Sequence, residues 1–289
     1  MSVTSAMFTG VSGLLANAEG INVIGNNLAN VNTVGFKSGR MLFSDQLSAS
    51  IGNNSQIGRG TQIQKVDNIF SQGTFETTEL VTDLAIQGDG FFAVQDAGGN
   101  DLYTRAGAFR MDSTSKFLTN PDGLKLLDSA GAVIDVSTLN VAASAAIPAI
   151  IADPLAVPPV VGAPAVPAVL AANFSKVTKV DNDGTITCLM SDGSSKTYPT
   201  KIGMALFPNP GGLEKKGGTV FGATAESGTV TVAAATTNNK IFTNSLEQSN
   251  VDMAGQFVKM ILTQRAYSAN SKTITTADEM TQEVLQLKR

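Results

Sequence analysis

Hydrophobic residues recur at a helical spacing at both ends of the chain and at a strand-like spacing between them. Near the N-terminus they follow a 4-3-4-3-7 pattern, a narrow coiled-coil-type stripe in which Gly25 fills the missing position. This N-terminal stripe consists of Met7, Val11, Leu14, Ala18, Ile21 and Leu28. A similar C-terminal stripe consists of Val251, Val258, Leu262, Ala266, Ala269, Thr276, Met280, Val284 and Leu287. The pattern predicts two terminal helices that pack as partners, because each alone is too weakly apolar to be stable.

The segment before the C-terminal stripe reads "SNVD" and carries residues that favour the start of a helix. Ser249, Asn250 or Asp252 could each accept hydrogen bonds from the first free amides of this helix.

The middle of the chain has the signature of antiparallel β structure. Strand-like runs are interrupted by four Asp-Gly steps, at residues 89–90, 122–123, 183–184 and 192–193. Asp-Gly between alternating or β-branched residues is a strong hairpin signal, because type I′ turns need positive φ at both central residues. The sequence therefore predicts an α+β protein: paired terminal helices plus a mainly antiparallel β domain, a small sandwich or irregular barrel.

One segment, residues 141–172, fits neither pattern. It holds six of the ten prolines, twelve alanines and a single charge, Asp153. Proline at this density excludes helix and interior strand, so we expect a polyproline-like loop. Its apolar character is unusual for a solvated linker, and we expect it to lie against a neighbouring protein surface.

Composition narrows the functional classes. Hydrophobic residues make up 43% of the chain, which excludes general disorder, and the net charge is −4 without basic clusters, which argues against nucleic-acid binding. The first twenty residues lack the basic region of a secretory signal, and no apolar run is long enough to predict a membrane-spanning helix. With Cys188 as the one cysteine, the chain can form no intrachain disulfide.

Candidate chemistry is sparse. The chain has no histidine, so the usual general base is missing, and Asp181 and Asp183 flank a turn glycine rather than a substrate site. "DNDGTITCLMSD" departs from a calcium loop in its glycine position and lacks the closing glutamate. Cys188 lies in an expected strand as buried apolar filler, with a cross-link between subunits as the alternative. We predict no catalytic residue, cofactor or metal site.

Long blocks of the sequence resemble a known family. They are "MSVTSAMFTGVSGLLANAEGINVIGNNLANVNTVGFKSGRMLFSDQL", "IGRGTQIQKVDNIFSQGTFETTELVTDLAIQGDGFF", "YTRAGAFRMD" and "NSLEQSNVDMAGQFVKMILTQRAYSANSKTITTADEMTQEVLQLKR". These blocks are similar to the bacterial flagellar rod and hook proteins over about residues 1–135 and 174–289. Within the family, "ITTADEMTQEVLQLKR" and the block from Ser249 to Lys272 resemble hook subunits more than distal rod subunits.

The resemblance implies a structural subunit of the hook, which polymerises helically into a curved, flexible tube that transmits motor torque. A distal or proximal rod subunit is the alternative, and a secreted enzyme or a β-rich adhesin are the alternatives outside the family. Implied partners are copies of itself, the flagellar rod, the hook cap, the hook–filament junction proteins and the type III export gate. The resemblance further implies an extracellular flagellar location, export without a cleaved signal, and no membrane insertion.

Two sets of residues acquire roles through the resemblance. In "FSDQL", Phe43 and Leu47 match an export motif, whereas an apolar pair anchoring a short helix is the simpler interpretation. The asparagine-rich stretch is the expected joint between helix and β domain, because Asn and Gly allow turn conformations and Asn side chains can satisfy freed peptide groups. The joint residues are Asn26, Asn27, Asn30, Asn32, Gly35 and Phe36.

These patterns suggest four parts of the chain. The expected boundaries are a helical domain over residues 1–30 and 248–289, a connecting segment over 31–69 and 240–247, a β domain over 70–140 and 174–239, and the Ala/Pro-rich loop over 141–173 in place of an outer domain. Subunit packing is expected along both stripes, because the first thirty-six residues carry only Glu19 as a charged side chain.

Overall fold

The structure is a computed structural model, and it describes residues 3–46, 49–52, 55–112, 116–140, 173–236 and 239–287. The chain divides into two compact units, one formed by Met1–Thr74 with Gln248–Arg289 and the other by Phe75–Glu247. We call these the helical unit and the β unit. Leu47 and the Ala/Pro-rich segment 141–172 lie outside the described residues.

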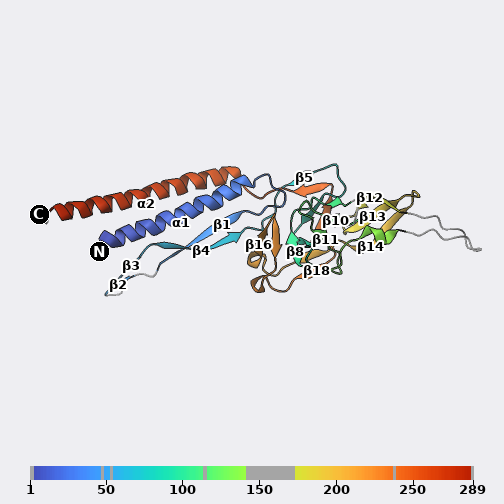
Figure 1. Cartoon of the computed structure of the whole chain (residues 1–289), viewed down its shortest axis with the longest axis horizontal. Coiled ribbons are helices and arrows are strands. Elements are labelled where there is room, and N and C mark those ends of the chain that lie inside the picture. The colour runs from blue at the N-terminus through green and yellow to red at the C-terminus, as the bar shows by residue number, and fades with distance from the viewer. Residues whose placement is uncertain are drawn as a thin grey trace, which may run out of the picture. The chain divides into compact units, whose positions relative to one another are not determined.

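Two long helices dominate the helical unit. Helix α1 (Val3–Ala29) and helix α2 (Met253–Leu287) lie side by side and run in opposite directions (Figure 1). Asp252 caps α2, since its two carboxylate oxygens accept hydrogen bonds from the amides of Ala254 at 3.1 Å and Gly255 at 3.1 Å. Both terminal helices and the β-rich middle were predicted from the sequence, and the α+β class is confirmed.

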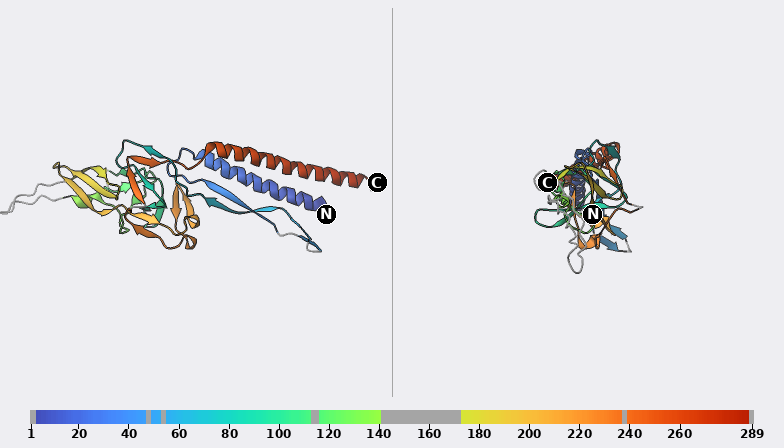
Figure 2. Two further views of the ribbon diagram at one scale, coloured as in Figure 1. Left: turned by 180° about the vertical axis from the view of Figure 1, so that it is seen from behind. Right: turned by 90° about the vertical axis from the view of Figure 1, so that its right-hand side faces the viewer.

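A long β-hairpin accompanies the helices. Strands β1 (Gly39–Asp45) and β4 (Thr61–Asn68) pair antiparallel, and β2 (Ala49–Gly52) pairs with β3 (Ser55–Ile57) beyond them. Figure 2 shows the hairpin running along the helix pair. Residues 31–69 were expected to form a connecting segment, and the structure shows that they form this hairpin, which belongs to the helical unit. Phe43 lies in strand β1, not in the short helix that its spacing suggested.

The β unit is built around a nine-stranded sheet. Its main path runs in the order β16-β17-β8-β7-β11-β10-β9, and β15 pairs with both β7 and β18. The strands of this sheet are β7 (Phe91–Gln95), β8 (Asp101–Thr104), β9 (Arg110–Met111), β10 (Leu118–Thr119), β11 (Lys125–Leu126), β15 (Met204–Leu206), β16 (Glu214–Gly217), β17 (Val220–Gly222) and β18 (Thr231–Ala233).

Smaller sheets and short helices complete the β unit. A three-stranded sheet is formed by β12 (Phe174–Val180), β13 (Thr185–Met190) and β14 (Ser195–Lys201). Strand β6 (Leu84–Gln87) pairs with β19 (Lys240–Thr243), and β5 (Phe75–Thr77) pairs with β20 (Ser245–Glu247). Residues 240–247 therefore belong to the β unit rather than to the connector expected from the sequence. The 3₁₀ helices are η1 (Val136–Leu139), η2 (Pro210–Gly212) and η3 (Ala225–Ser227).

Three of the four Asp-Gly steps form hairpin turns. They connect β10 to β11, β12 to β13, and β13 to β14. In each turn only the glycine has positive φ: 80° at Gly123, 79° at Gly184 and 81° at Gly193. The turns are therefore not type I′, because that type needs positive φ at two residues. The step at 89–90 links β6 and β7, which pair with other strands.

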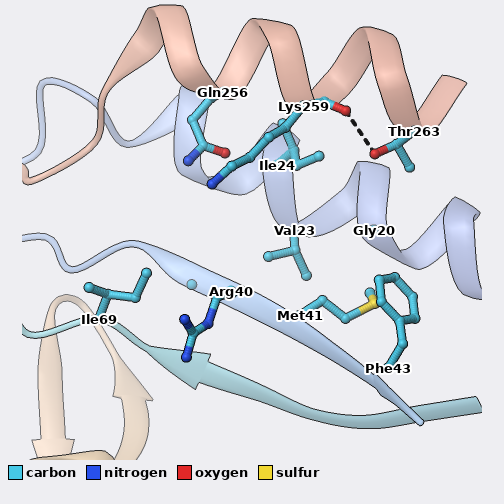
Figure 3. Close-up of a pocket in the computed structure, with 11 residues that line it drawn as sticks. Gly20, Val23, Ile24, Arg40, Met41, Phe43, Ile69, Gln256, Lys259 and Thr263 are labelled. Atoms are coloured by element: carbon cyan, nitrogen blue, oxygen red, sulfur yellow. Dashed lines mark hydrogen bonds between the residues drawn. The ribbon is translucent and has the colours of Figure 1, made fainter.

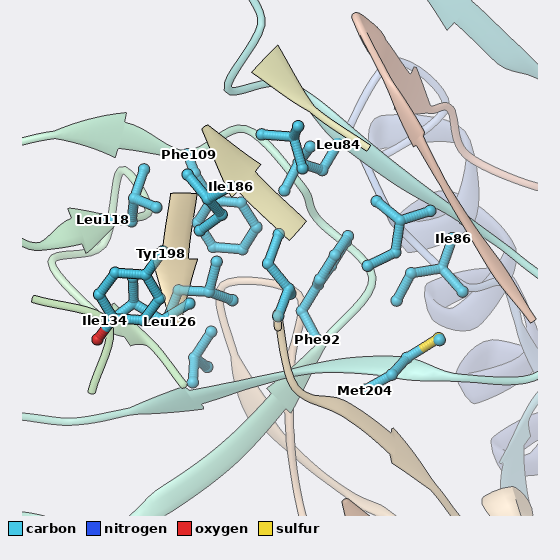
Figure 4. Packing of buried hydrophobic residues seen from close by; sticks show 14 of the residues in the cluster. Leu84, Ile86, Phe92, Phe109, Leu118, Leu126, Ile134, Ile186, Tyr198 and Met204 are labelled. Carbon is cyan, nitrogen blue, oxygen red and sulfur yellow. The ribbon is translucent and has the colours of Figure 1, made fainter. Parts of the chain in front are cut away.

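The hydrophobic core lies in the β unit. Figure 4 shows apolar side chains from separate sheets meeting there, among them Leu84, Phe92, Ile186 and Met204. Phe92 and Phe109 stack edge to face with their centroids 5.2 Å apart. Cys188 belongs to this core, is fully buried in β13 and forms no disulfide. Burial raises the pKa of its thiol to about 11, so Cys188 acts as apolar filler in the folded chain.

Candidate functional site: the helix faces and the joint

The contact between α1 and α2 is made by small and polar residues. A methyl group added at Gly10 would lie 2.9 Å from Cγ1 of Ile274, and one added at Gly13 would lie 2.6 Å from Nδ2 of Asn270. At Gly20 the nearest atom would be Cγ2 of Thr263, at 3.4 Å. The helix backbones thus approach closely where α1 has no side chain.

The contact follows a heptad spacing. On α2, Gln256, Thr263, Asn270 and Ala277 recur every seven residues and face α1. Among them, Gln256 and Ala277 are buried, although α2 exposes most of its other side chains. The two helices therefore pack on each other within the subunit, and this contact, which we call the seam, is largely polar.

The apolar stripes predicted from the sequence are displaced from this seam by one residue. Leu262 precedes Thr263 and Ala269 precedes Asn270, while on α1 Leu14 follows Gly13 and Ile21 follows Gly20. Successive residues of a helix point about 100° apart, so each stripe forms a face beside the seam. The expectation that the two stripes pack on each other is thus corrected. The helices approach most closely at the glycines of α1, so they are in contact through the face next to each stripe.

The exposure of the stripe residues follows from this displacement. On α2 the exposed stripe residues are Val258, Leu262, Ala269, Thr276, Met280, Val284 and Leu287, whereas Ala266 is half-buried. On α1 Val11 is exposed, and the half-buried members are Met7, Leu14, Ala18, Ile21 and Leu28. Further exposed apolar side chains on the helices are Phe8, Leu15, Met253, Phe257, Ile261, Tyr267 and Leu285. The pair thus presents extensive apolar surface that no described residue covers.

The predicted joint begins inside α1. Asn26 and Asn27 lie in the last turns of the helix, and the side chain of Asn30 donates a hydrogen bond to the carbonyl of Asn26 at 2.9 Å. Gly35 is buried and has a φ of 68°, which favours glycine. The buried Phe36 follows it, while Asn32 is exposed.

Two asparagines connect the helices to the hairpin. The buried Asn27 both accepts from the amide of Gly39 and donates to its carbonyl, each at 2.8 Å, and it contacts Oε1 of Gln256 at 3.4 Å. Asn250 accepts from the amide of Ser38 at 2.8 Å and donates to the carbonyl of Ile69 at 2.8 Å. The network joins the end of α1, both hairpin strands and the start of α2.

Lys37 adds a buried charge to this network. Its side chain is 1% exposed, and its ammonium donates to the carbonyl of Ser71 at 2.8 Å. Ser71 also bonds Asn250, at 3.0 Å between Oγ and Nδ2. Sequence reasoning identified Asn27 but missed Lys37, Ser38, Asn250 and Gln256 as network members. The seven-residue recurrence of polar residues on α2 could have indicated Gln256.

A groove lies between the helix pair and the hairpin. It has a volume of about 270 Å³, and Figure 3 shows Val23, Met41 and Phe43 extending into the space between α1 and β1. The remaining lining residues are Gly20, Ile24, Gly39, Arg40, Ile69, Gln256, Lys259 and Thr263. Phe43, proposed for export, therefore forms one wall of this groove and is half exposed.

A buried ion pair holds the last strand of the β unit. Nη1 of Arg105 lies 3.2 Å from Oε2 of Glu247, and both side chains are almost completely buried. Arg105 also donates to the carbonyl of Gly88 at 2.6 Å and lies over the ring of Phe91. Burial lowers the pKa of Arg105, and the charge of Glu247 opposes that effect and favours the charged form of Arg105.

The described part of the chain contains no cluster of three or more His, Cys, Asp or Glu residues able to hold a metal ion. In the same residues, no helix is long and apolar enough to cross a membrane. The features that remain as a candidate site are an unpartnered apolar surface on a helix pair and a rigid polar joint.

Family models match three parts of the chain. Residues 7–37 match the model described as flagella basal body rod protein, and residues 85–188 match the flagellar hook protein FlgE/F/G D1 domain. Residues 243–287 match the C-terminal region of the flagellar basal body rod FlgEFG proteins. The first and third matches cover most of α1 and α2, and the second lies in the β unit.

Complete proteins match along nearly the whole chain. The flagellar basal-body rod protein FlgG of Bacillus subtilis is 34% identical over 299 residues, covering 98% of this chain and 99% of that protein. The flagellar hook protein FlgE of Borreliella burgdorferi is 28% identical over 441 residues, with 98% and 99% covered. A crystal structure of Helicobacter pylori flagellar hook protein FlgE2 is 14% identical over 57% of this chain and 43% of that chain, with a TM-score of 0.23, too low to compare the folds.

The exposed apolar stripes beside a polar seam define a class of protein whose paired terminal helices present apolar surface for contact with other chains. Within that class, the chain belongs to the flagellar rod and hook protein family.

Proposed function

We propose that the chain is a structural axial subunit, without enzymatic activity, that polymerises with copies of itself. The observation that carries this proposal is the displacement of both apolar stripes from the seam between the helices. A monomer would leave Val258, Leu262, Met280 and Val284 in water, each more than half exposed. Exposed apolar patches of this kind mark interaction surfaces, and neighbouring copies would bury them.

The polar joint supports the same function. Asn27, Lys37 and Asn250 make short hydrogen bonds that join helices and hairpin, so the helical unit can transmit force without sliding at this point. A subunit that passes torque along a polymer needs such a rigid connection.

Within the family, we propose the hook, a curved flexible tube outside the cell. The C-terminal stretch "ITTADEMTQEVLQLKR", which resembles hook subunits, supports this choice. The rod is the second candidate, favoured by the alignment of the chain with Bacillus subtilis FlgG over nearly its whole length at 34% identity. The alignment with Borreliella FlgE extends over 441 residues, so that hook protein contains a long segment that this chain lacks.

The proposed partners follow from this position. They are the rod, the hook cap, the hook–filament junction proteins and the type III export gate, with export of the unfolded chain and no cleaved signal. Phe43 and Leu47 are proposed to be read by the export gate. To test this, Phe43→Ala with Leu47→Ala should lower secretion by intact cells more than it lowers the stability of the β unit. Normal secretion of the double variant would contradict the export role.

Polymerisation can be tested with purified full-length chain. We expect tubes or fibres above a critical concentration, seen by electron microscopy and sedimentation. The double variant Leu262→Ser with Val284→Ser should raise that concentration, because both side chains lie on the exposed α2 stripe. Thr275→Ser, also exposed on α2, is the control. A wild-type chain that stays monomeric at all concentrations would contradict the proposed function.

Antibody labelling separates the hook from the rod. An antibody to the β unit should label a hook subunit on intact cells, because a hook lies outside the envelope. A rod subunit would be labelled only after the envelope has been opened. Labelling restricted to opened cells would therefore exclude the hook and favour the rod.

A further inference from the structure

The C-terminal part of α2 extends beyond α1. The close approaches of Gly10 to Ile274 and of Gly20 to Thr263 fix an antiparallel register. Continued toward the N-terminus, this register places Val3, where α1 begins, opposite the turn around Met280. From there to Leu287, α2 has no described residue of α1 beside it. We call residues 280–287 the α2 overhang.

The α2 overhang is apolar on one face and acidic beside it. Met280, Val284 and Leu287 follow an i, i+4, i+7 spacing and are 52%, 62% and 86% exposed. The acidic residues Glu279 and Glu283 lie next to this face, and residues 273–287 contain no lysine or arginine. The overhang is therefore an amphipathic helix end with acidic side chains beside its apolar face, and the basic Lys288 and Arg289 follow it in the sequence.

The groove at the other end of the helix pair has the complementary character. Its walls include the apolar side chains of Val23, Met41 and Phe43, and Lys259 lines it from α2, whereas the guanidinium of Arg40 extends away from α1 (Figure 3). Figure 3 shows Lys259 extending from α2 toward α1. The Lys259 ammonium makes no ion pair with the described residues, and Arg40 has only a 3.8 Å contact with Asp67. A groove of about 270 Å³ suits a few aliphatic side chains better than a drug-sized ligand, whose sites span roughly 300–1,000 Å³.

We propose that the α2 overhang of one subunit docks into the groove of a second copy of the chain. The apolar face would enter the groove, and Glu283 beside that face would meet Lys259. One chain cannot make this contact with itself, because α2 is a continuous helix and its residues 260 and 284 lie about 35 Å apart along the axis. When each copy uses its overhang on one neighbour and its groove on another, the contact repeats head to tail and builds an open helical polymer, whereas a two-fold pair that exchanges both overhangs would stop at a dimer. This inference rests on the proposed function and assigns one contact within it.

Cross-linking tests the contact directly. In full-length chain, Met41→Cys combined with Val284→Cys should give a ladder of disulfide-linked multimers under mild oxidation. The matched control is Met41→Cys with Leu285→Cys, because Leu285 is 63% exposed but points about 100° away from Val284. The native Cys188 should not contribute, since it is fully buried. We expect at least a fivefold excess of cross-linked product in the test pair.

Charge exchange provides an independent measurement. Lys259→Glu or Glu283→Lys alone should raise the critical concentration for assembly about tenfold, because an attraction becomes a repulsion. The combined variant should return to within about twofold of wild type. Lys272→Glu changes an exposed charge on the same helix away from the groove and should leave the critical concentration unchanged.

The outcomes separate this contact from the function on which it rests. If wild-type chain polymerises but the two cysteine pairs cross-link equally and the charge exchange rescues nothing, the docking proposal is wrong and the polymer function stands. If wild-type chain does not polymerise, the function is contradicted. In that case the cysteine pairs at high protein concentration still decide whether the overhang and the groove meet.

Discussion

At the scale of single residues, glycine and asparagine determine how the helical unit is held together. Gly10, Gly13 and Gly20 allow the two helices to approach, and Asn27 and Asn250 satisfy backbone groups where the chain changes direction. Large apolar residues play a small part in this unit, because its buried hydrophobic residues are limited to Ala16, Ile24, Phe36 and Ala277 within the described chain.

The seam glycines give the first prediction. Gly10→Ala with Gly13→Ala should destabilise the helical unit by about 1–3 kcal/mol, because the new methyl groups would overlap Ile274 and Asn270. Urea unfolding followed by circular dichroism measures the effect. Gly25→Ala is the matched control, since nothing lies within 4 Å of the added methyl group, and it should stabilise α1 by up to about 1 kcal/mol. Equal effects of the seam and control variants would contradict the close approach.

The joint gives the second prediction. Asn250→Ala leaves the amide of Ser38 and the carbonyl of Ile69 without their side-chain partner, and we expect a loss of about 2 kcal/mol or more in the helical unit. Asn32→Ala is the control, because Asn32 is exposed and its side chain makes no hydrogen bond with the described residues. Stability is again measured by urea unfolding, and a neutral Asn250→Ala would show that the network is dispensable.

Sequence reasoning worked for residues whose role depends on their neighbours in the chain. The cap of α2 was expected among Ser249, Asn250 and Asp252, and it is Asp252; the positive φ of Gly35 likewise follows from local turn chemistry. The roles of Lys37 and Asn250 depend on Ser71 and Ile69, which are distant from Asn250 in sequence, so no local pattern indicated them. Cys188 was assigned correctly as buried filler because its alternating strand was evident.

At the scale of elements, the sequence predicted both helices but assigned their contact to the wrong face. A search for apolar periodicity finds the largest side chains, whereas the seam uses residues small enough for backbones to approach. The hairpin β1–β4 was missed for a related reason. Its strand β4 alternates polar residues with few apolar ones and is mostly exposed, so its period-two signal is weak.

The α2 overhang gives the third prediction. In dilute monomer, amides of residues 280–287 should exchange with solvent faster than those near Thr263. Helix stability comes mainly from packing, and α1 packs against the region of Thr263 but not against residues 280–287. In the assembled polymer the overhang should become protected. Hydrogen exchange with mass spectrometry compares the two states, with residues 256–263 as the internal control. Equal protection in monomer and polymer would mean that no neighbour covers this end.

At the scale of the whole chain, the two units differ in what stabilises them. The large buried side chains Phe91, Phe92, Phe109 and Ile186 all belong to the β unit, together with the buried pair of Arg105 and Glu247. The helical unit relies on hydrogen bonds and small contacts, and its apolar stripes remain for other chains. Such a division suits a subunit whose helices gain much of their stability on assembly.

The fourth prediction follows from this difference. With rising urea, the helical circular dichroism signal should fall before Cys188 becomes reactive, because hydrophobic burial stabilises the β unit more strongly than the helical unit. Labelling at pH 8 reports on Cys188, whose thiol is protected by burial and has a pKa raised from 9.0 to about 11.

Because of the same thiol, the β unit should unfold at lower urea as the pH rises. The folded-state pKa of the thiol lies above its unfolded-state value. The contribution of the thiol to the free energy of unfolding is therefore fully present below pH 9. It is lost as the pH rises toward 11, because in this range the thiol ionises more readily in the unfolded chain. The unfolding transition of the β unit, followed by circular dichroism so that the thiol-free variant can be compared, should therefore move to lower urea between these pH values, and that of Cys188→Ala should move less. If helical signal and thiol reactivity change together at every pH, the two units unfold as one and the helical unit is not the less stable of the two.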